Sequence, residues 1–171
     1  MTLIKVDIKN LSEFVIRFCQ SNQMSISNLK LQKILYYIQA WHLVYFNKHP
    51  FFDDTPEAWI NGPVYRKIYN EYKDCGREEF SILEDNHSKE EAYKKALSFL
   101  NISKEQEEYL RASLLYFGSL SAQQLVMRTH LEKPWNEARN GLGELEYSDK
   151  IISHEMMYEY YSQVKAKRQA K

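Results

Sequence analysis

Apolar residues recur along much of the chain at the three- and four-residue spacing that is typical of amphipathic helices. This rhythm runs first through residues 7–22, where Asp7 stands at the N-cap position, and it predicts a helix with one buried stripe. Residues 28–46, which follow the N-cap candidate Ser27, are apolar on nearly every face. A helix of that kind belongs in the middle of a bundle, so we predict that it is the central helix.

Residues 51–60 lose the helical spacing, and their last four positions predict a short extended segment. The tripeptide Asn61-Gly62-Pro63 follows directly. Proline is favoured at the first position of a helix, because the N–H that it lacks would be unpaired there in any case. We therefore predict that Gly62-Pro63 begins a third helix, which continues as far as Gly76.

Helices in the second half of the chain are marked by capping boxes, in which a Ser and a Glu or Gln three residues later bond to each other's backbone N–H. Such pairs stand at Ser88 and Glu91, at Ser103 and Gln106, and at Ser121 and Gln124. They predict three helices after a polar loop at residues 77–87. A short helix is expected at 134–139, and a last one at about 154–167.

These patterns together predict an all-α protein. The expected fold is a compact bundle of about six to eight helices around the central helix 28–46, with one short extended segment near 51–60. Apolar residues make up 44% of the chain, which is enough to build a core. The chain has no internal repeat and no long linker, so we predict a single domain over residues 1–171.

Charge and hydropathy argue against two classes of partner. The chain has 23 basic and 23 acidic residues, whereas a general nucleic-acid binder has a basic excess, so no direct contact with nucleic acid is expected. No apolar run approaches the roughly 18 residues of a membrane span, and the N-terminus lacks the features of a signal peptide. We expect a cytoplasmic protein without a membrane partner.

Candidate chemistry is sparse. The two cysteines have no zinc or redox spacing, and the five histidines include no pair at metal-ligand spacing, so no metal and no cofactor is expected. Phosphate-binding loops and nucleophile elbows are also missing, and we predict no catalytic residues and no enzyme. One enzymatic alternative stays open, a small-molecule pocket built from His42, Thr129 and His130.

Several sequence blocks occur in an order that is typical of one family. They are LKLQKILYYIQAWHL (residues 29–43), EAWINGPVYRKIYNEYK (57–73), LSAQQLVMRTHLEKPWNEAR (120–139) and a closing helix that contains Tyr160-Tyr161. In this arrangement the chain resembles the Panacea family, the SocA-like antitoxin domains that are also known as GepA-like phage-associated proteins. The resemblance covers nearly the whole chain.

The resemblance implies an all-α antitoxin that binds and neutralises a cognate protein toxin encoded beside it. A second reading that it implies is a proteolytic adaptor, which delivers the toxin to a AAA+ protease of the ClpXP type. The basic stretch at residues 165–171 is then the first place to look for a protease contact. The sequence names neither the toxin nor the oligomeric state, and a homo-oligomer stays open.

Partner contacts are expected around the Gly-Pro and Pro-Trp corners of the family blocks. Aromatic and arginine side chains are effective interface anchors, and a corner defined by proline loses little entropy on binding. The candidate partner-binding residues are Trp59, Tyr65, Arg66, His130, Trp135 and Arg139. His130 also has a purely structural reading, in which its ring bonds to the backbone and fixes the turn before Pro134-Trp135.

Overall fold

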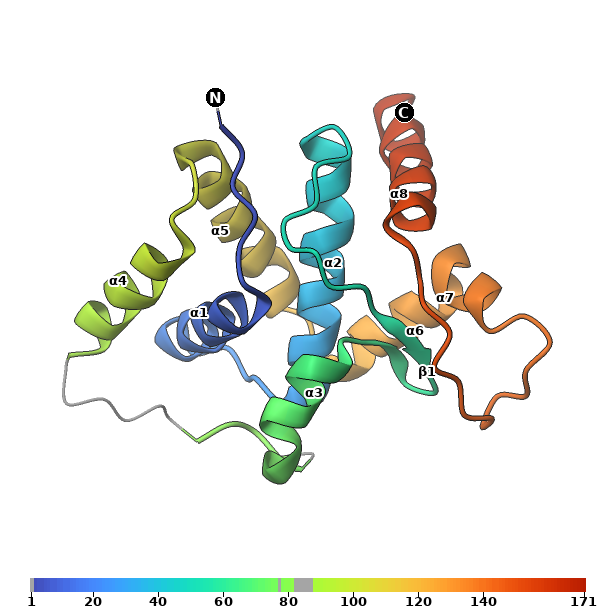
Figure 1. Cartoon of the computed structure of the whole chain (residues 1–171), viewed down its shortest axis with the longest axis horizontal. Coiled ribbons are helices and arrows are strands. Elements are labelled where there is room, and N and C mark those ends of the chain that lie inside the picture. The colour runs from blue at the N-terminus through green and yellow to red at the C-terminus, as the bar shows by residue number, and fades with distance from the viewer. Residues whose placement is uncertain (1, 77, 82–87) are drawn as a thin grey trace.

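The computed structural model of the chain describes residues 2–76, 78–81 and 88–171 (Figure 1). In chain order, its elements are α1 (Ile8–Ser21), α2 (Asn28–Tyr45), β1 (Glu57–Trp59), β2 (Gly62–Val64), α3 (Arg66–Tyr72), the 3₁₀ turn η1 (Lys73–Cys75), α4 (Lys89–Leu100), α5 (Lys104–Gly118), α6 (Ala122–Leu131), α7 (Lys133–Ala138) and α8 (His154–Gln169). The predicted mostly helical fold is confirmed. Most of the polar loop predicted at 77–87 lies outside the described residues.

Helix α2 lies at the centre of the bundle, as its apolar faces predict (Figure 1). It contacts α1, α3, α5, α6, α8 and the strand β2. Its core side chains Leu31, Ile34, Leu35 and Ile38 are fully buried. Within the part of the chain that the structure describes, no helix, α2 included, is both long enough and apolar enough to cross a membrane.

The first helix has the predicted cap and the predicted buried stripe. The Asp7 side chain accepts hydrogen bonds from the backbone N–H of Lys9 and Asn10, at 2.8 and 3.1 Å. Helix α1 packs against α4, and Cys19 on its inner face is fully buried. Burial raises the pKa of the Cys19 thiol to about 11, so this cysteine is an inert core residue at neutral pH.

Three later helices begin at the predicted capping boxes. In each box the serine hydroxyl accepts from the backbone of the third helical residue, whose side chain accepts in return from the serine N–H. The pairs are Ser88 with Glu91 in α4, Ser103 with Gln106 in α5, and Ser121 with Gln124 in α6. These helix starts are therefore marked by pairs of residues only three positions apart in the sequence.

The prediction that Gly62-Pro63 begins a helix is wrong. Residues 57–64 form a β-hairpin in which β1 and β2 pair antiparallel, with Ala58 opposite Pro63 and Trp59 opposite Gly62. Helix α3 begins only at Arg66, after β2. The predicted extended segment is confirmed as β1, which lies inside residues 51–60.

Gly62 and Pro63 suit a hairpin as well as a helix start, and this explains why the prediction failed. Gly62 has a φ of +98°, which suits the residue after a tight hairpin turn and is open mainly to glycine. Proline needs no hydrogen-bonded N–H at either place. All three residues of β2 are buried, so the strand lacks the alternation of apolar and polar residues that reveals a half-buried strand. Its apolar residues instead continue the spacing of α3.

A distant segment lies along the other edge of β1. The Ala58 N–H donates to the carbonyl of Lys150 at 2.8 Å, and the Ile152 N–H donates to the carbonyl of Pro56 at 2.9 Å. Glu57 and Ile151 form an isolated antiparallel bridge between these two bonds. The backbone just before α8 is thus tied to the hairpin, which lies against α6 in Figure 1.

Candidate partner-binding site

The family blocks meet at the hairpin, which is held from below by the central helix. The Lys33 ammonium of α2 donates to the carbonyl of Pro63 at 2.9 Å. The side-chain oxygen of the preceding residue, Gln32, accepts from the backbone N–H of Tyr65 at 2.8 Å. Both bonds are buried, and both use main-chain atoms of the hairpin or of the residue that follows it. The Leu-Gln-Lys block therefore positions the Gly-Pro block.

At Gly62 the hairpin backbone closely approaches side chains of α2 and α6. A Cβ atom built on Gly62 would lie 2.6 Å from Cε of Lys33 and 2.8 Å from Oγ1 of Thr129. Both distances are far below ordinary contact, so only glycine fits here. Thr129 itself is buried in α6, where its hydroxyl donates to the Val126 carbonyl at 2.8 Å.

Lys33 is an unusual residue for the middle of a core. It is fully buried, and within the described residues its ammonium has no carboxylate partner. Burial lowers the pKa of Lys33 to about 7. The amine is therefore close to its titration midpoint at neutral pH, while its bond to Pro63 persists in either protonation state.

The lysine makes stability depend on pH. In the unfolded chain it titrates near 10.5, so between pH 7 and 10.5 the unfolded state holds a proton that the folded state lacks. The free energy of unfolding of the wild type should therefore rise with pH by about 1.4 kcal/mol per pH unit over this range, relative to Lys33→Met. Below pH 7 both states are protonated, and the difference should become constant.

Urea denaturation of the wild type and of Lys33→Met, at about pH 7.5 and about pH 9, measures this slope. The difference between the two proteins should change by about 2 kcal/mol. Parallel pH profiles would show that Lys33 keeps an ordinary pKa in the folded protein.

Trp135 and Arg139 hold the hairpin from its other side. The Trp135 indole N–H donates to the carbonyl of Trp59 at 2.8 Å. The Arg139 guanidinium donates to the carbonyl of Ala58 at 2.9 Å, and also to those of Gly143 and Glu146 at 3.0 and 2.6 Å. Arg139 is only 5% exposed. It therefore joins the hairpin to the loop after α7 from inside the protein.

His130 packs flat on Trp135, with ring centroids 4.0 Å apart and the planes 16° from parallel. Burial lowers the pKa of the His130 ring, against a hydrogen bond to the Ile60 backbone that raises it. Its Nε2 atom is buried without a hydrogen-bond partner. The bond to the hairpin turn supports the structural reading of this histidine.

The outer face of the hairpin displays a charged and aromatic cluster. Arg66 is exposed and makes a bidentate ion pair with Glu57, with distances of 2.9 and 2.7 Å. Its guanidinium lies 5.2 Å from the ring centroid of the half-buried Trp59, and it donates to the hydroxyl of Tyr147 at 2.9 Å. These contacts fix a guanidinium and an indole at the surface, which is the chemistry of an interface anchor.

The six predicted residues therefore fall into different environments. Arg66 is exposed, while Trp59, His130 and Trp135 are half-buried around the hairpin. Arg139 is buried beneath it, and Tyr65 is 1% exposed with its ring against Phe52. The structure brings these residues together, but Tyr65 and Arg139 offer almost no surface to a partner.

Sequence reasoning did not find the loop between α7 and α8. Leu145 is 83% exposed, and Tyr147 and Ile151 are also exposed large side chains of this loop. Tyr147 touches Arg66, and Ile151 lies in the bridge to Glu57, so the loop extends the outer face of the hairpin. The apolar residues of the loop lack a period of 2 or 3.6, so no sequence signal distinguishes their exposure from burial.

The enzymatic alternative gains no support from the arrangement of its residues. His42 is fully buried at the end of α2, where Nδ1 lies 2.7 Å from the His49 carbonyl and its ring stacks on Phe46 and Phe51. Burial lowers the pKa of His42 to about 4. Within the described residues, its hydrogen bonds and ring contacts share no residue with those of His130.

Comparison with known proteins decides the family. The family model described as "Antitoxin SocA-like, Panacea domain" matches residues 31–136. Antitoxin SocA of Caulobacter vibrioides is 30% identical over 170 residues, which cover 92% of this chain and 86% of that protein. The chain belongs to the SocA-like Panacea family. No solved structure matches it.

The stretch that matches the Panacea model begins in α2 and ends in α7. It includes Gly62 of the hairpin and the two residues that lie against it, Lys33 and Thr129. It also includes Trp135, whose indole bonds to the hairpin. In this Panacea protein, the family blocks thus build and hold the hairpin. The resemblance that the sequence suggested is confirmed, and its motifs have a structural explanation.

Proposed function

We propose that this chain is the antitoxin of a toxin–antitoxin pair and neutralises its protein toxin by forming a direct complex, without catalysis. Membership of the SocA-like antitoxin family carries the proposal. The hairpin supports it, because its backbone is anchored from below while its outer face presents Arg66 and Trp59. Preorganised anchors of this kind bind a protein with little loss of entropy.

Co-expression with the neighbouring open reading frame tests the function. The neighbour alone should arrest growth, and this chain should restore growth and co-purify with the neighbour as a stoichiometric complex. A neighbour that is harmless alone, or that never co-purifies, would contradict the proposal.

The adaptor reading predicts a different result in the same strains. In a host that lacks the ClpXP-type protease, an adaptor loses its protective effect and the toxin half-life lengthens, whereas direct neutralisation keeps both unchanged. This reading places the protease contact in the basic stretch at 165–171, where Lys165 and Arg168 lie over the rings of Tyr45 and Trp41.

The outer face of the hairpin is the first contact surface to test. Arg66→Ala should weaken toxin binding by about tenfold or more, because it removes an anchor that the ion pair with Glu57 holds in place. The matched control is Lys67→Ala, which removes an exposed cation from the next position of α3. Isothermal titration calorimetry with the purified product of the neighbouring open reading frame measures both variants.

Thermal unfolding should be nearly unchanged in both variants, since exposed ion pairs contribute about 1 kcal/mol or less to stability. Equal affinities for the wild type, Arg66→Ala and Lys67→Ala would place the toxin interface elsewhere on the protein.

A further inference from the structure

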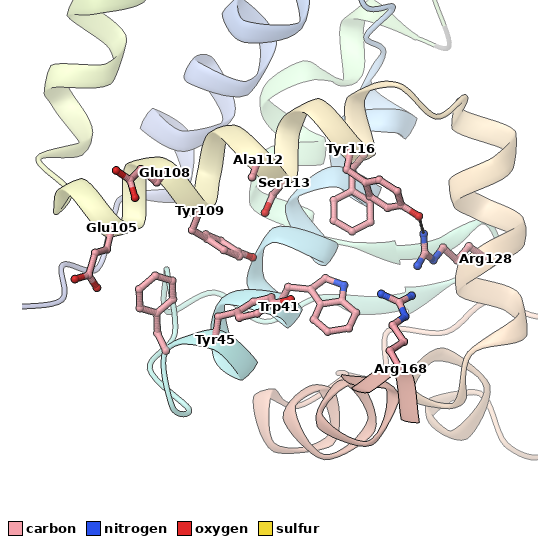
Figure 2. Close-up of a pocket in the computed structure, with 12 residues that line it drawn as sticks. Trp41, Tyr45, Glu105, Glu108, Tyr109, Ala112, Ser113, Tyr116, Arg128 and Arg168 are labelled. Carbon is pink, nitrogen blue, oxygen red and sulfur yellow. Dashed lines mark hydrogen bonds between the residues drawn. The ribbon is translucent and has the colours of Figure 1, made fainter. Parts of the chain in front are cut away.

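A second surface lies away from the hairpin, in a groove between α2, α5 and the ends of α6 and α8 (Figure 2). We define the groove by its lining residues, Trp41, Tyr45, Phe46, Glu105, Glu108, Tyr109, Ala112, Ser113, Tyr116, Phe117, Arg128 and Arg168. Its volume is about 600 Å³, and none of the hairpin residues lines it. This volume is within the range of roughly 300–1,000 Å³ that is usual for specific binding sites.

The walls of the groove are aromatic and partly open to solvent. Tyr45 of α2 is 57% exposed, and Tyr116 of α5 is 53% exposed. Tyr109, between them, is half-buried, and its hydroxyl donates to the Ile38 carbonyl at 2.6 Å. Large aromatic side chains are enriched in the centres of protein interfaces, where they supply contact area with few rotatable bonds.

One end of the groove is basic. Figure 2 shows the guanidinium groups of Arg128 and Arg168 directed toward each other beside Trp41. Arg168 lies 5.4 Å from the Trp41 ring centroid, and Arg128 donates to the Tyr116 hydroxyl at 3.1 Å. Within the described residues, neither guanidinium forms a salt bridge. Ring stacking therefore fixes two arginines while their N–H groups remain available to an acceptor.

A half-buried acid, Glu132, lies behind this end and partly offsets its charge. The Glu132 carboxylate accepts from the Tyr37 hydroxyl, and burial raises the pKa of Glu132 while Arg128 and Arg168 act to lower it. Lys165 adds a further cation beside the groove, with its ammonium 4.5 Å from the Tyr45 ring centroid. The basic end therefore retains a positive balance.

The opposite end of the groove is acidic. Glu105 and Glu108 line it from the first turns of α5, are exposed, and form no salt bridge in the described part of the chain. From Glu105 to Tyr116, α5 rises about 17 Å at about 1.5 Å per residue. That length matches about five residues of extended peptide.

We propose that the groove binds a short segment of the toxin, in which apolar side chains stand between an acidic residue and a basic residue. Arg128 and Arg168 receive the acidic residue, the glutamates receive the basic one, and the aromatic walls cover the apolar side chains between them. The inference rests on the proposed function and names a contact surface for it. A nucleotide complements the groove less well, because it carries its negative charge at one end and offers the glutamates nothing.

Charge reversal at the rim tests the proposal. Arg168→Glu should weaken binding of the purified product of the neighbouring open reading frame by at least about tenfold, because it places a carboxylate in the groove against the acidic residue of the toxin segment. The matched control is Lys167→Glu, which makes the same change of charge on the preceding residue of α8. Lys167 does not line the groove, so this substitution should change affinity less than about twofold. Both positions are exposed, and circular dichroism verifies that both variants fold.

A steric variant tests the same groove without altering charge. Ala112 is exposed in the groove wall on α5, so Ala112→Trp should fill the groove and abolish toxin binding. Ala166→Trp, at an exposed position of α8 outside the lining, is its control and should bind normally. An acid-to-lysine substitution in the toxin segment should restore binding to Arg168→Glu.

The outcomes separate this inference from the proposed function. If the wild-type protein does not bind the toxin, both fail. If the wild type binds and both groove variants bind equally well, the proposed function stands and the groove inference is overturned. The inference is also overturned if these variants change only the binding of a nucleotide such as GTP, or only the dimerisation of this chain.

Discussion

Gly62→Ala should lower the free energy of unfolding by about 3–4 kcal/mol. Two separate costs add at this position. The φ of +98° is strained for any residue with a Cβ, at about 1–2 kcal/mol. The new Cβ would also lie 2.6 Å from Lys33 and 2.8 Å from Thr129, and overpacking of a core costs about 1–3 kcal/mol.

Gly141→Ala is the matched control. Gly141 has a φ of +84°, but a Cβ built there meets no atom within 4 Å. It should therefore show the backbone cost alone, about 1–2 kcal/mol. Urea denaturation of both variants measures the difference. If the two alanines cost the same, the close approach beneath the hairpin contributes nothing, and the role assigned to Lys33 and Thr129 there is wrong.

Arg139→Ala should be destabilising by about 3–5 kcal/mol. The buried guanidinium donates to the buried carbonyl of Ala58 and to the carbonyls of Gly143 and Glu146 in the exposed loop after α7. A hydrogen bond from a charged group contributes about 1.5–3 kcal/mol, and entry of water at the loop carbonyls recovers part of that. Arg111→Ala, which breaks a half-exposed ion pair with Glu107 and a cation–π contact with Tyr93, should cost only about 1 kcal/mol.

Arg139→Lys separates charge from geometry. An ammonium keeps the charge but cannot reach divergent carbonyls as a planar guanidinium does, so most of the stability should still be lost. Thermal unfolding of Arg139→Ala, Arg139→Lys and Arg111→Ala gives the order. A lysine variant as stable as the wild type would show that the charge alone holds the loop after α7.

The helices were predictable because their signals are local. Asp7 and the capping boxes bond within three residues, and the spacing of apolar residues revealed the stripe of α1 and the central position of α2. The hairpin was not predictable in the same way. β2 is three residues long, too short to show a period of two, and its Gly-Pro pair suits a helix start equally well.

The candidate site was predictable as a set of residues but not as a surface. The family blocks pointed to Tyr65 and Arg139 as contacts, yet both are buried. Arg139 is buried because it bonds to Ala58, which lies 81 positions earlier in the chain, and no local pattern encodes that distance. For the same reason, nothing in the sequence brings Trp41 beside Arg168 to form the groove.

The hairpin is held in place almost entirely through hydrogen bonds to its backbone. Lys33, Trp135 and Arg139 bond to the carbonyls of Pro63, Trp59 and Ala58, and none of these bonds depends on an outward-facing side chain. Mutations on the outer face can therefore accumulate without loosening the support. With its hairpin held in this way, the fold can vary the side chains of its recognition surface while the supporting contacts stay the same.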